Sequence, residues 1–427
     1  MPSDTEVQPE SADSRRVNYL RYRSTALFLI GVGLGNIGLI AAITVSTLAA
    51  EEISRNSTWS GLPSALAILG TAIGTTVLAE AMQRWGRRNG LVGGYLLATL
   101  GASLAVVALF RGSLGLLLLA SLAIGLGRSG DALSRYLVAD LHPLWRRASA
   151  ISWVVWMGTV GAVLGPNSLE PSGLLAARLG LPELSGAFLV TIAAYGVVAL
   201  GYAVLLRPDP STLVIDEAPD GRSETQVRLR SLFLRGNVRV ALAVLVVGQM
   251  VMVLIMTMTP LYLKLSGHGL GSIGLVVSSH IVGMFVFSPL TGRLVDRWGR
   301  VPVILIGQAI LLVSAVSALM APSSSVGLVA AALFLLGFGW NLGFVAGSAL
   351  LSSGIELRKR ARLQGVTDSL IWFSAALASA ASGIVLSVLG YDALCLIGMA
   401  LLVIPVATLI GCRRSLLVER ASPVRAQ

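Results

Sequence analysis

Three charged residues fall on one face of a segment that is otherwise strongly apolar. Arg128, Asp131 and Arg135 lie within residues 114–139, and at about 100° per residue an α-helix would place them within about 60° of one another. An ionised side chain in hydrocarbon costs about 2.5–3.5 kcal/mol even on a mild insertion scale, so these residues should face a water-filled cavity and pair. Asp131 is expected to pair with either arginine. It could then bind a proton or form a fixed salt-bridge clamp.

Other residues of the apolar segments could bind a proton or a polar ligand. His280 is the only histidine inside such a segment and could titrate near neutral pH, although a buried histidine with a hydrogen-bond partner is the alternative. Several methionines follow Gln249, and their flexible thioethers suit either a varied amphiphilic ligand or ordinary helix packing. The candidates for a substrate cavity are Asn36, Gln249, Met252, Met256, Trp340 and Asn341.

The elements that must hold these side chains are apolar helices. The chain of 427 residues is 55% hydrophobic and only 12% charged, with a mean hydropathy of +0.81, whereas soluble domains are about a quarter charged. A spanning helix needs about 20 mostly apolar residues. The sequence therefore predicts an all-α membrane protein with twelve spans, at residues 26–49, 62–82, 91–111, 114–139, 149–167, 187–206, 239–263, 273–292, 301–321, 326–353, 367–389 and 393–411.

The basic residues indicate how these spans are oriented. Of 32 arginines and lysines, 26 lie in the tails, the central loop and the loops on one side, four lie in the opposite loops and two lie inside the fourth span. Positive charge marks the cytoplasmic side, so both termini are expected in the cytoplasm. The net charge of +11 is then a topology signal and does not indicate nucleic-acid binding. Only two of these residues are lysines, a bias that suggests a GC-rich bacterial genome.

The chain divides into two similar halves. "QRWGRR" at 83–88 matches "DRWGRV" at 296–301, and "RRA" at 146–148 matches "KRA" at 359–361, both at an offset of 213 residues. A constant offset of half the chain indicates two parallel six-helix repeats. The predicted parts are an N-tail (1–23), an N-terminal six-helix bundle (24–206), a central loop (207–236), a C-terminal six-helix bundle (237–412) and a C-tail (413–427).

A charged loop motif resembles one that is typical of the major facilitator superfamily. That motif, G-x-x-x-D-R-x-G-R, joins the second and third helices and returns between the eighth and ninth. The second copy here is complete, whereas the first has Ala79 for the glycine and Gln83 for the aspartate. The resemblance implies a twelve-helix fold that works by alternating access, with helices one, four, seven and ten around a central cavity. The motif residues of the complete copy are Gly292, Asp296, Arg297, Gly299 and Arg300.

The chemistry of this motif suits a gate at the cytoplasmic side. Glycine permits a tight turn between two helices because it tolerates positive φ. Asp296 could face the N-terminal end of a neighbouring helix, or an arginine, and hold the cytoplasmic side closed. The alternative is that the arginines only anchor the topology.

A second motif resembles the G-x-x-x-G-P signature of superfamily members that export drugs by proton antiport. "GTVGAVLGPN" at 158–167 provides Gly161, Gly165 and Pro166, although Asn167 and Ser168 replace the glycines expected after the proline. The same small-residue spacing also serves plain helix packing.

These features together predict a secondary active transporter of the bacterial plasma (inner) membrane. The favoured function is proton-coupled export of a small amphiphilic organic molecule. The alternatives are uptake or exchange of an organic anion, which two arginines against one carboxylate would favour, and a membrane scaffold or sensor without transport. No constellation of side chains suggests an enzyme. We expect no cofactor, metal or nucleic-acid partner, and a functional monomer in the lipid bilayer.

Overall fold

The computed structural model describes residues 12–142, 144–213, 232–351, 353 and 357–413. Every regular element in these ranges is a helix, which confirms the predicted all-α fold. The N-terminal half contains α1 (Ala12–Ser54), α2 (Leu62–Trp85), α3 (Arg87–Arg111), α4 (Leu114–Asp140), α5 (Leu144–Asn167), α6 (Leu169–Arg178) and α7 (Ser185–Leu205). The C-terminal half contains α9 (Gly236–Leu265), α10 (Leu270–Phe285), α11 (Ser288–Trp298), α12 (Arg300–Met320), α13 (Val326–Leu351), α14 (Leu357–Leu401) and α15 (Val403–Gly411).

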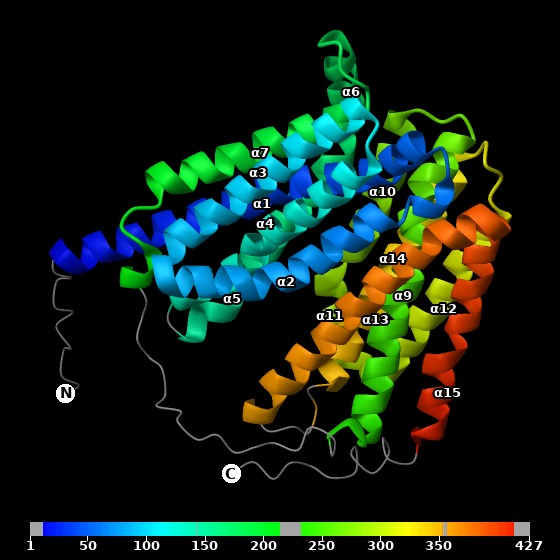
Figure 1. Ribbon diagram of the computed structural model, residues 1–427. Coiled ribbons are helices and arrows are strands. Elements are labelled where there is room, and N and C mark those ends of the chain that lie inside the picture. Colours follow the sequence, from blue (N-terminus) through cyan, green and yellow to red (C-terminus); the bar gives the residue numbers. More distant parts are fainter. Residues whose placement is uncertain (1–11, 143, 214–231, 352, 354–356, 414–427) are drawn as a thin grey trace.

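Ten helical segments among the described residues are long and apolar enough to cross a membrane. The last of them, Val366–Gly411, has 46 residues, although about 20 suffice for one crossing. Gly390 interrupts it with a non-helical backbone (φ 82°, ψ 177°). In Figure 1 the chain reverses its direction within α14, and its last part runs back together with α15. The predicted spans 367–389 and 393–411 lie on either side of this glycine.

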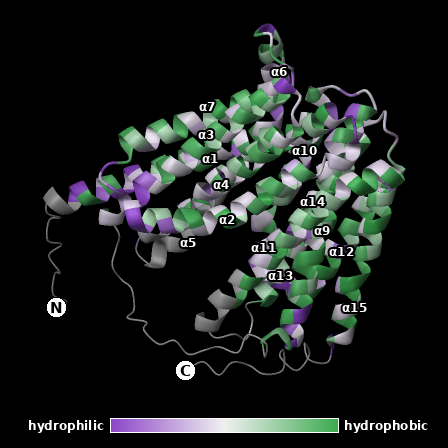
Figure 2. Ribbon diagram, viewed as in Figure 1, coloured by the Kyte–Doolittle hydropathy of each residue, from purple (hydrophilic) through white to green (hydrophobic). Residues whose placement is uncertain are grey.

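The outer surface of the helices is apolar, as a protein embedded in lipid requires. Large side chains such as Leu100, Phe110 and Val388 are exposed, and Figure 2 shows hydrophobic residues along the length of most helices. Soluble proteins seldom expose continuous apolar surface of this kind. The chain is therefore a multi-pass membrane protein.

Two helices differ from the sequence-based expectation. The first span was expected from residue 26, but α1 already begins at Ala12. Arginine is a good helix former, and Arg21 ties this extension to the chain after α7 by donating a hydrogen bond from Nε to the carbonyl of Leu213 at 2.9 Å. The short helix α6 was not predicted, because its ten residues are fewer than a membrane span needs.

The two halves meet at one end of the molecule. Figure 1 shows two groups of helices that converge at the end where α6 and the α1–α2 connection lie, which we call the far end. They diverge toward the end where α1 begins and α15 finishes, which we call the terminus side.

Hydrogen bonds between the halves lie at the far end. The hydroxyl of Thr58 donates to Ser387 Oγ at 2.8 Å, and Ser379 Oγ donates to the carbonyl of Gly61 at 3.0 Å. Lys264 pairs with Glu52 at 3.0 Å. This conformation is therefore closed at the far end.

Candidate functional site

Asp131 lies inside the N-terminal half, between α4, α3 and α1. Its side chain is only 7% exposed, and its Oδ1 accepts a hydrogen bond from the hydroxyl of Tyr95 on α3 at 2.5 Å. Gly35 on α1 makes room for the carboxylate, because a Cβ atom at this position would lie 2.8 Å from Oδ1. The three residues form one buried cluster, which we call the Asp131 cluster.

Aromatic rings surround this cluster. The ring centroid of Tyr95 lies 5.8 Å from that of Tyr195 and 5.4 Å from that of Tyr202, and all three tyrosines are fully buried. Oδ2 of Asp131 has no hydrogen-bond partner within the described part of the chain. A carboxylate in this environment lacks most of the hydrogen bonds that water would give its ionised form.

The two arginines of the predicted charged face are not equivalent. Arg128 interacts electrostatically with Asp131 but forms no direct ion pair with it among the described side chains. In this conformation Asp131 turns instead toward α1 and α3, where Gly35 leaves space and Tyr95 supplies a donor, and the predicted pairing with either arginine stays a prediction. The backbone of Arg135 belongs to α4, but its side chain lies outside the described residues.

His280 is buried in the other half of the molecule, in the contact between α10 and α13. Its side chain is 1% exposed, and its Nδ1 lies 2.9 Å from the carbonyl oxygen of Leu333. Nε2 has no partner among the described residues. The residue thus has one hydrogen bond to a neighbouring helix, which is the arrangement expected of a histidine that supports packing.

The predicted cavity residues of the C-terminal half separate into two groups. Trp340 donates from Nε1 to Oε1 of Gln249 at 2.9 Å, which links α13 to α9. Asn341 instead donates from Nδ2 to the carbonyl of Met284 and to Ser288 Oγ, each at 2.7 Å, and accepts from Thr291 Oγ1. Its amide is used in binding α10 and α11 to α13.

Three predicted cavity residues remain, and each contacts protein atoms close to it: Asn36, Met252 and Met256. Asn36 is half-buried and donates from Nδ2 to the carbonyl of Val32 on its own helix at 2.9 Å. Met252 belongs to the buried apolar core, and the half-buried Met256 packs against that core.

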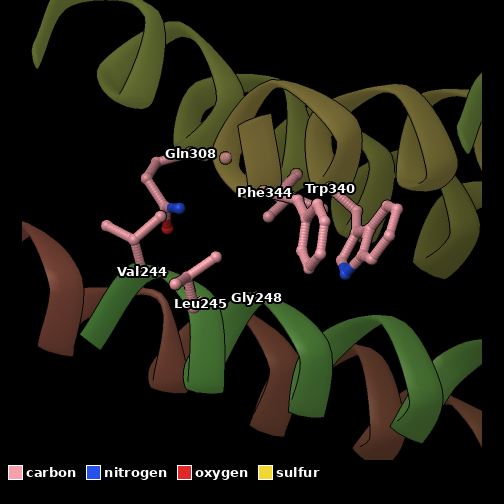
Figure 3. A pocket seen from close by; sticks show the side chains of 8 residues that line it. Val244, Leu245, Gly248, Gln308, Trp340 and Phe344 are labelled. Carbon is pink, nitrogen blue, oxygen red and sulfur yellow. The ribbon is translucent and has the colours of Figure 1, made fainter. Parts of the chain in front are cut away.

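A narrow gap lies between α9, α12 and α13, and it is too small to hold a water molecule. Figure 3 shows Gln308 and Phe344 on opposite sides of this space, with Trp340 beside Phe344 and with Val244 and Leu245 along α9. Gln308 is not among the cavity residues predicted from the sequence. Its signal is a lone carboxamide inside the apolar span 301–321, which alone does not tell a ligand-binding residue from one bonded to a neighbouring helix.

The complete loop motif at 292–300 forms the predicted turn between two helices, but only one of its two glycines lies in that turn. Gly299 joins α11 to α12 with φ 88° and ψ 165°, a conformation that L-residues rarely adopt. Gly292 lies inside α11 and is not part of the turn. Asp296, Arg297 and Arg300 are exposed.

The first copy of the motif forms the same turn at Gly86. The carboxylate beside this turn belongs to Asp209, which follows α7 in the chain. Gly86 has φ 87° and ψ 155°, and Asp209 Oδ2 accepts a hydrogen bond from the backbone N–H of Arg88 at 3.0 Å. Asp209 therefore caps the start of α3. Partial burial raises the pKa of Asp209, but the hydrogen bonds from Ser211, Arg88 and Arg87 outweigh this and hold its pKa below the ordinary value.

The glycines of the second motif bring helices into close contact. Gly161 packs on the carbonyl of Gly33 in α1, and a Cβ atom at Gly165 would lie 2.7 Å from the carbonyl oxygen of Ile37. Pro166 lies near the end of α5, and its carbonyl packs against Gly274 of α10 in the other half. The first two contacts join α5 to α1 within the N-terminal half, and the third joins α5 to α10 of the other half.

Comparisons with known proteins agree on the family. The model of the Major Facilitator Superfamily matches residues 24–274 and 266–423. An uncharacterised transporter of this type, YdeG of Bacillus subtilis, is 37% identical over 394 residues, with 90% of this chain and 91% of that protein covered. The riboflavin transporter RfnT of Brucella anthropi is 27% identical over 372 residues, with 87% and 90% covered.

A solved structure shares the fold. A bacterial homologue of the human lysosomal transporter Spinster, in an inward-facing and unoccupied conformation, superposes with a TM-score of 0.70 at 15% identity, covering 96% of this chain and 99% of that one. The chain belongs to the Major Facilitator Superfamily, a family of membrane transporters and not of enzymes.

Proposed function

We propose that this protein is a secondary active transporter that works by alternating access and exports a small amphiphilic organic molecule in exchange for protons. One observation carries the alternating-access part of the proposal. The hydrogen bonds between the halves lie at the far end, whereas the helices diverge toward the terminus side (Figure 1). Such a molecule is one member of a two-state pair, and closure of the terminus side would produce the other.

The proposed topology has twelve spans in two parallel six-helix repeats. The offset of 213 residues supports it, because it relates Gly86 to Gly299 and both have the same unusual backbone angles. The distribution of arginine and lysine supports cytoplasmic termini, so the terminus side would face the cytoplasm. The bacterial relatives favour the plasma (inner) membrane of a bacterium. We propose that the monomer is sufficient for transport.

Asp131 is the proposed proton-binding group. It is a buried carboxyl group whose hydrogen bond to Tyr95 ties it to a neighbouring helix. An ionised carboxylate without water or an ion partner is costly, and movement of Arg128 toward or away from it during the cycle would change that cost. A proton would then be taken up or released as the helices move. The alternative is a fixed structural cluster, and His280 is the next candidate for the proton site.

The exposed motif residues are the proposed cytoplasmic gate. Asp296 lies on the terminus side and is exposed in this conformation, and in the opposite conformation it would meet a helix N-terminus or an arginine of the other half. A stabilisation of a few kcal/mol is enough to shift such an equilibrium.

One alternative substrate is a flavin-like heteroaromatic molecule, because a relative is named a riboflavin transporter and the C-terminal half contains the stacked rings of Trp340 and Phe344. Uptake or exchange of an organic anion, and a scaffold without transport, remain further alternatives.

The test is transport by purified protein in proteoliposomes with an imposed pH gradient and a panel of dyes, drugs, flavins and organic acids. Asp131→Asn should lose gradient-driven accumulation by at least tenfold but keep substrate counterflow. The matched control is Glu80→Gln on α2, which changes an exposed carboxylate that pairs with Arg84. Full accumulation by well-folded Asp131→Asn would remove the proton role from this residue. Absence of all transport by the wild-type protein would favour the scaffold.

A further inference from the structure

Tyr95 supplies the one hydrogen bond that the side chain of Asp131 receives from the described part of the chain. Its hydroxyl donates to Oδ1 at 2.5 Å, whereas Oδ2 has no partner among these residues. Because Oδ1 is occupied, Oδ2 is the atom at which a proton from water would bind. A hydrogen bond to an ionised carboxylate is about twice as strong as one to a neutral acceptor. The contact with Tyr95 is therefore strongest when Asp131 carries no proton.

Packing holds the ring of Tyr95 in place without the help of this bond. The side chain is fully buried. On one side its ring centroid lies 5.8 Å from that of Tyr195 and 5.4 Å from that of Tyr202, both on α7. On the other side a Cβ atom at Gly130 of α4 would lie 3.5 Å from the ring, which is an ordinary contact distance. The ring is thus fixed between α4 and α7, and its hydroxyl is presented to the carboxylate.

The other polar groups around Asp131 act on it without a direct bond. The titratable and charged groups that face it from the described residues are Tyr95 on α3, Arg128 on α4, and Tyr195 and Tyr202 on α7, while α1 presents Gly35, which has no side chain. Arg128 forms no ion pair with Asp131 among the described side chains. The hydroxyl of Tyr195 has no partner there either. Of these groups, Tyr95 alone is bonded to the carboxylate.

We propose that Tyr95 is a positioning residue for the proton: it holds Oδ1 of Asp131, leaves Oδ2 to the proton, and sets the pH range in which this proton binds. The inference rests on the proposed proton role of Asp131. A hydrogen bond that favours the ionised carboxylate opposes proton binding by the same free energy. Proton binding in turn weakens the contact between α3 and α4, so it changes how firmly these two helices are joined.

Infrared titration of the purified full-length protein tests the inference without requiring transport. The C=O band of the protonated carboxyl group appears as the pH falls, and the part of it that is missing in Asp131→Asn belongs to Asp131. In Tyr95→Phe the pH at which half of this band is present should rise by about one unit, a tenfold gain in proton affinity. The ring stays, but the ionised form loses its hydrogen bond.

Tyr195→Phe is the matched control, because it removes a buried hydroxyl of the same cluster that is not bonded to Asp131. Its midpoint should equal that of the wild-type protein. A purely structural role of Tyr95 would lower the melting temperature of Tyr95→Phe but leave the midpoint of its Asp131 band unchanged. That result, or an equal rise in Tyr195→Phe, would overturn the inference.

A measurement on the wild-type protein keeps the inference testable if Tyr95→Phe does not fold. With tyrosine that is isotope-labelled at the ring carbon bearing the hydroxyl, one C–O band should shift over the same pH range as the Asp131 band. This shift should be absent in Asp131→Asn, and a tyrosine band that ignores the state of Asp131 would contradict the proposal. The expected shifts without any pH-driven transport in proteoliposomes would overturn the proposed function alone. If Asp131→Asn loses no carboxyl band at any pH, both fail.

Discussion

Three positions of the N-terminal half have counterparts 213 residues later in the C-terminal half. Gly35 corresponds to Gly248, Tyr95 corresponds to Gln308, and Asp131 corresponds to Phe344. In both halves the first member of the set is a glycine on the first helix, the second is a polar residue on the third helix, and the third lies on the fourth helix. In the N-terminal half the carboxylate of Asp131 fills the space over Gly35 and bonds to Tyr95. In the C-terminal half Phe344 takes the place of the carboxylate, and the space over Gly248 stays open.

This comparison shows how one helical arrangement can support two kinds of chemistry. In the N-terminal half the carboxylate fills the space over Gly35 and one of its two oxygens is bonded to Tyr95, so this position is compact. A neutral amide opposite an aromatic ring leaves a space with unused hydrogen-bonding groups. Matched substitutions at these equivalent positions can test whether the two halves differ in this way.

The largest effect is expected from adding a methyl group at the two equivalent glycines. In Gly35→Ala the new Cβ would lie 2.8 Å from Asp131 Oδ1, so the carboxylate or α1 must move. Overpacking of this kind costs about 1–3 kcal/mol. We expect a lower melting temperature in detergent and weaker transport.

Gly248→Ala is the matched control for that experiment. Its Cβ meets nothing within 4 Å, and alanine is favoured over glycine in a helix by about 0.5–1 kcal/mol. The melting temperature should stay equal or rise. An equal loss of stability in Gly35→Ala and Gly248→Ala would mean that an added methyl group is tolerated equally at this position in the two halves.

Loss of the polar partner on the third helix should also have opposite effects in the two halves. Tyr95→Phe removes the hydrogen bond to Asp131 and leaves a buried carboxylate unsatisfied, at a cost of about 1–3 kcal/mol. Gln308→Leu removes an amide that has no partner among the described residues, and its melting temperature should rise. Thermal unfolding of both variants against wild type measures the difference, and destabilisation by Gln308→Leu would show that the amide is bonded in the protein.

The helices and the turn were predictable because their signals are local. An apolar run of sufficient length predicts a span, and Gly299 was expected in a turn between two helices. Gly292 was assigned to that turn although it lies inside α11, because a glycine in a charged stretch does not reveal whether its backbone is helical.

The site was less predictable because it depends on the rotation of each helix. The spacing of Arg128, Asp131 and Arg135 gives one face of α4 but not the neighbour that this face meets. Asp131 bonds to Tyr95, 36 residues earlier in the chain, and nothing in an isolated tyrosine predicts that contact. Gln308 was not predicted for the same reason, because the gap that it lines is formed by three helices, α9, α12 and α13.

The two loop motifs extend the comparison to the terminus side, where the expected effects are smaller. Asp296→Asn changes an exposed residue, so the melting temperature in detergent should not change. Loss of the proposed gate should slow transport a few-fold and increase the labelling of cysteines placed on the terminus side of the cavity. Unchanged labelling with normal transport would leave these residues as topology anchors.

Asp209 should act through stability alone, because its carboxylate caps α3 within one half. A negative charge at a helix N-terminus contributes about 0.3–1 kcal/mol, reduced here because the side chain is only half-buried. Its folded-state pKa is depressed, since the hydrogen bonds from Ser211 and Arg88 outweigh the effect of partial burial. The contribution is therefore fully present above the unfolded-state pKa of about 3.9 and is lost as the pH falls through the folded-state value.

Asp209→Asn should accordingly lower the melting temperature slightly at pH 7, and the difference from wild type should shrink below about pH 4 as the native carboxylate also becomes neutral. Melting curves of both proteins across that range measure it. Asp296→Asn provides the comparison at pH 7, because this exposed carboxylate lies near the end of α11 and not at the start of a helix. A difference that persists at low pH would mean that Asp209 acts through its shape and hydrogen bonds, not through its charge at the start of α3.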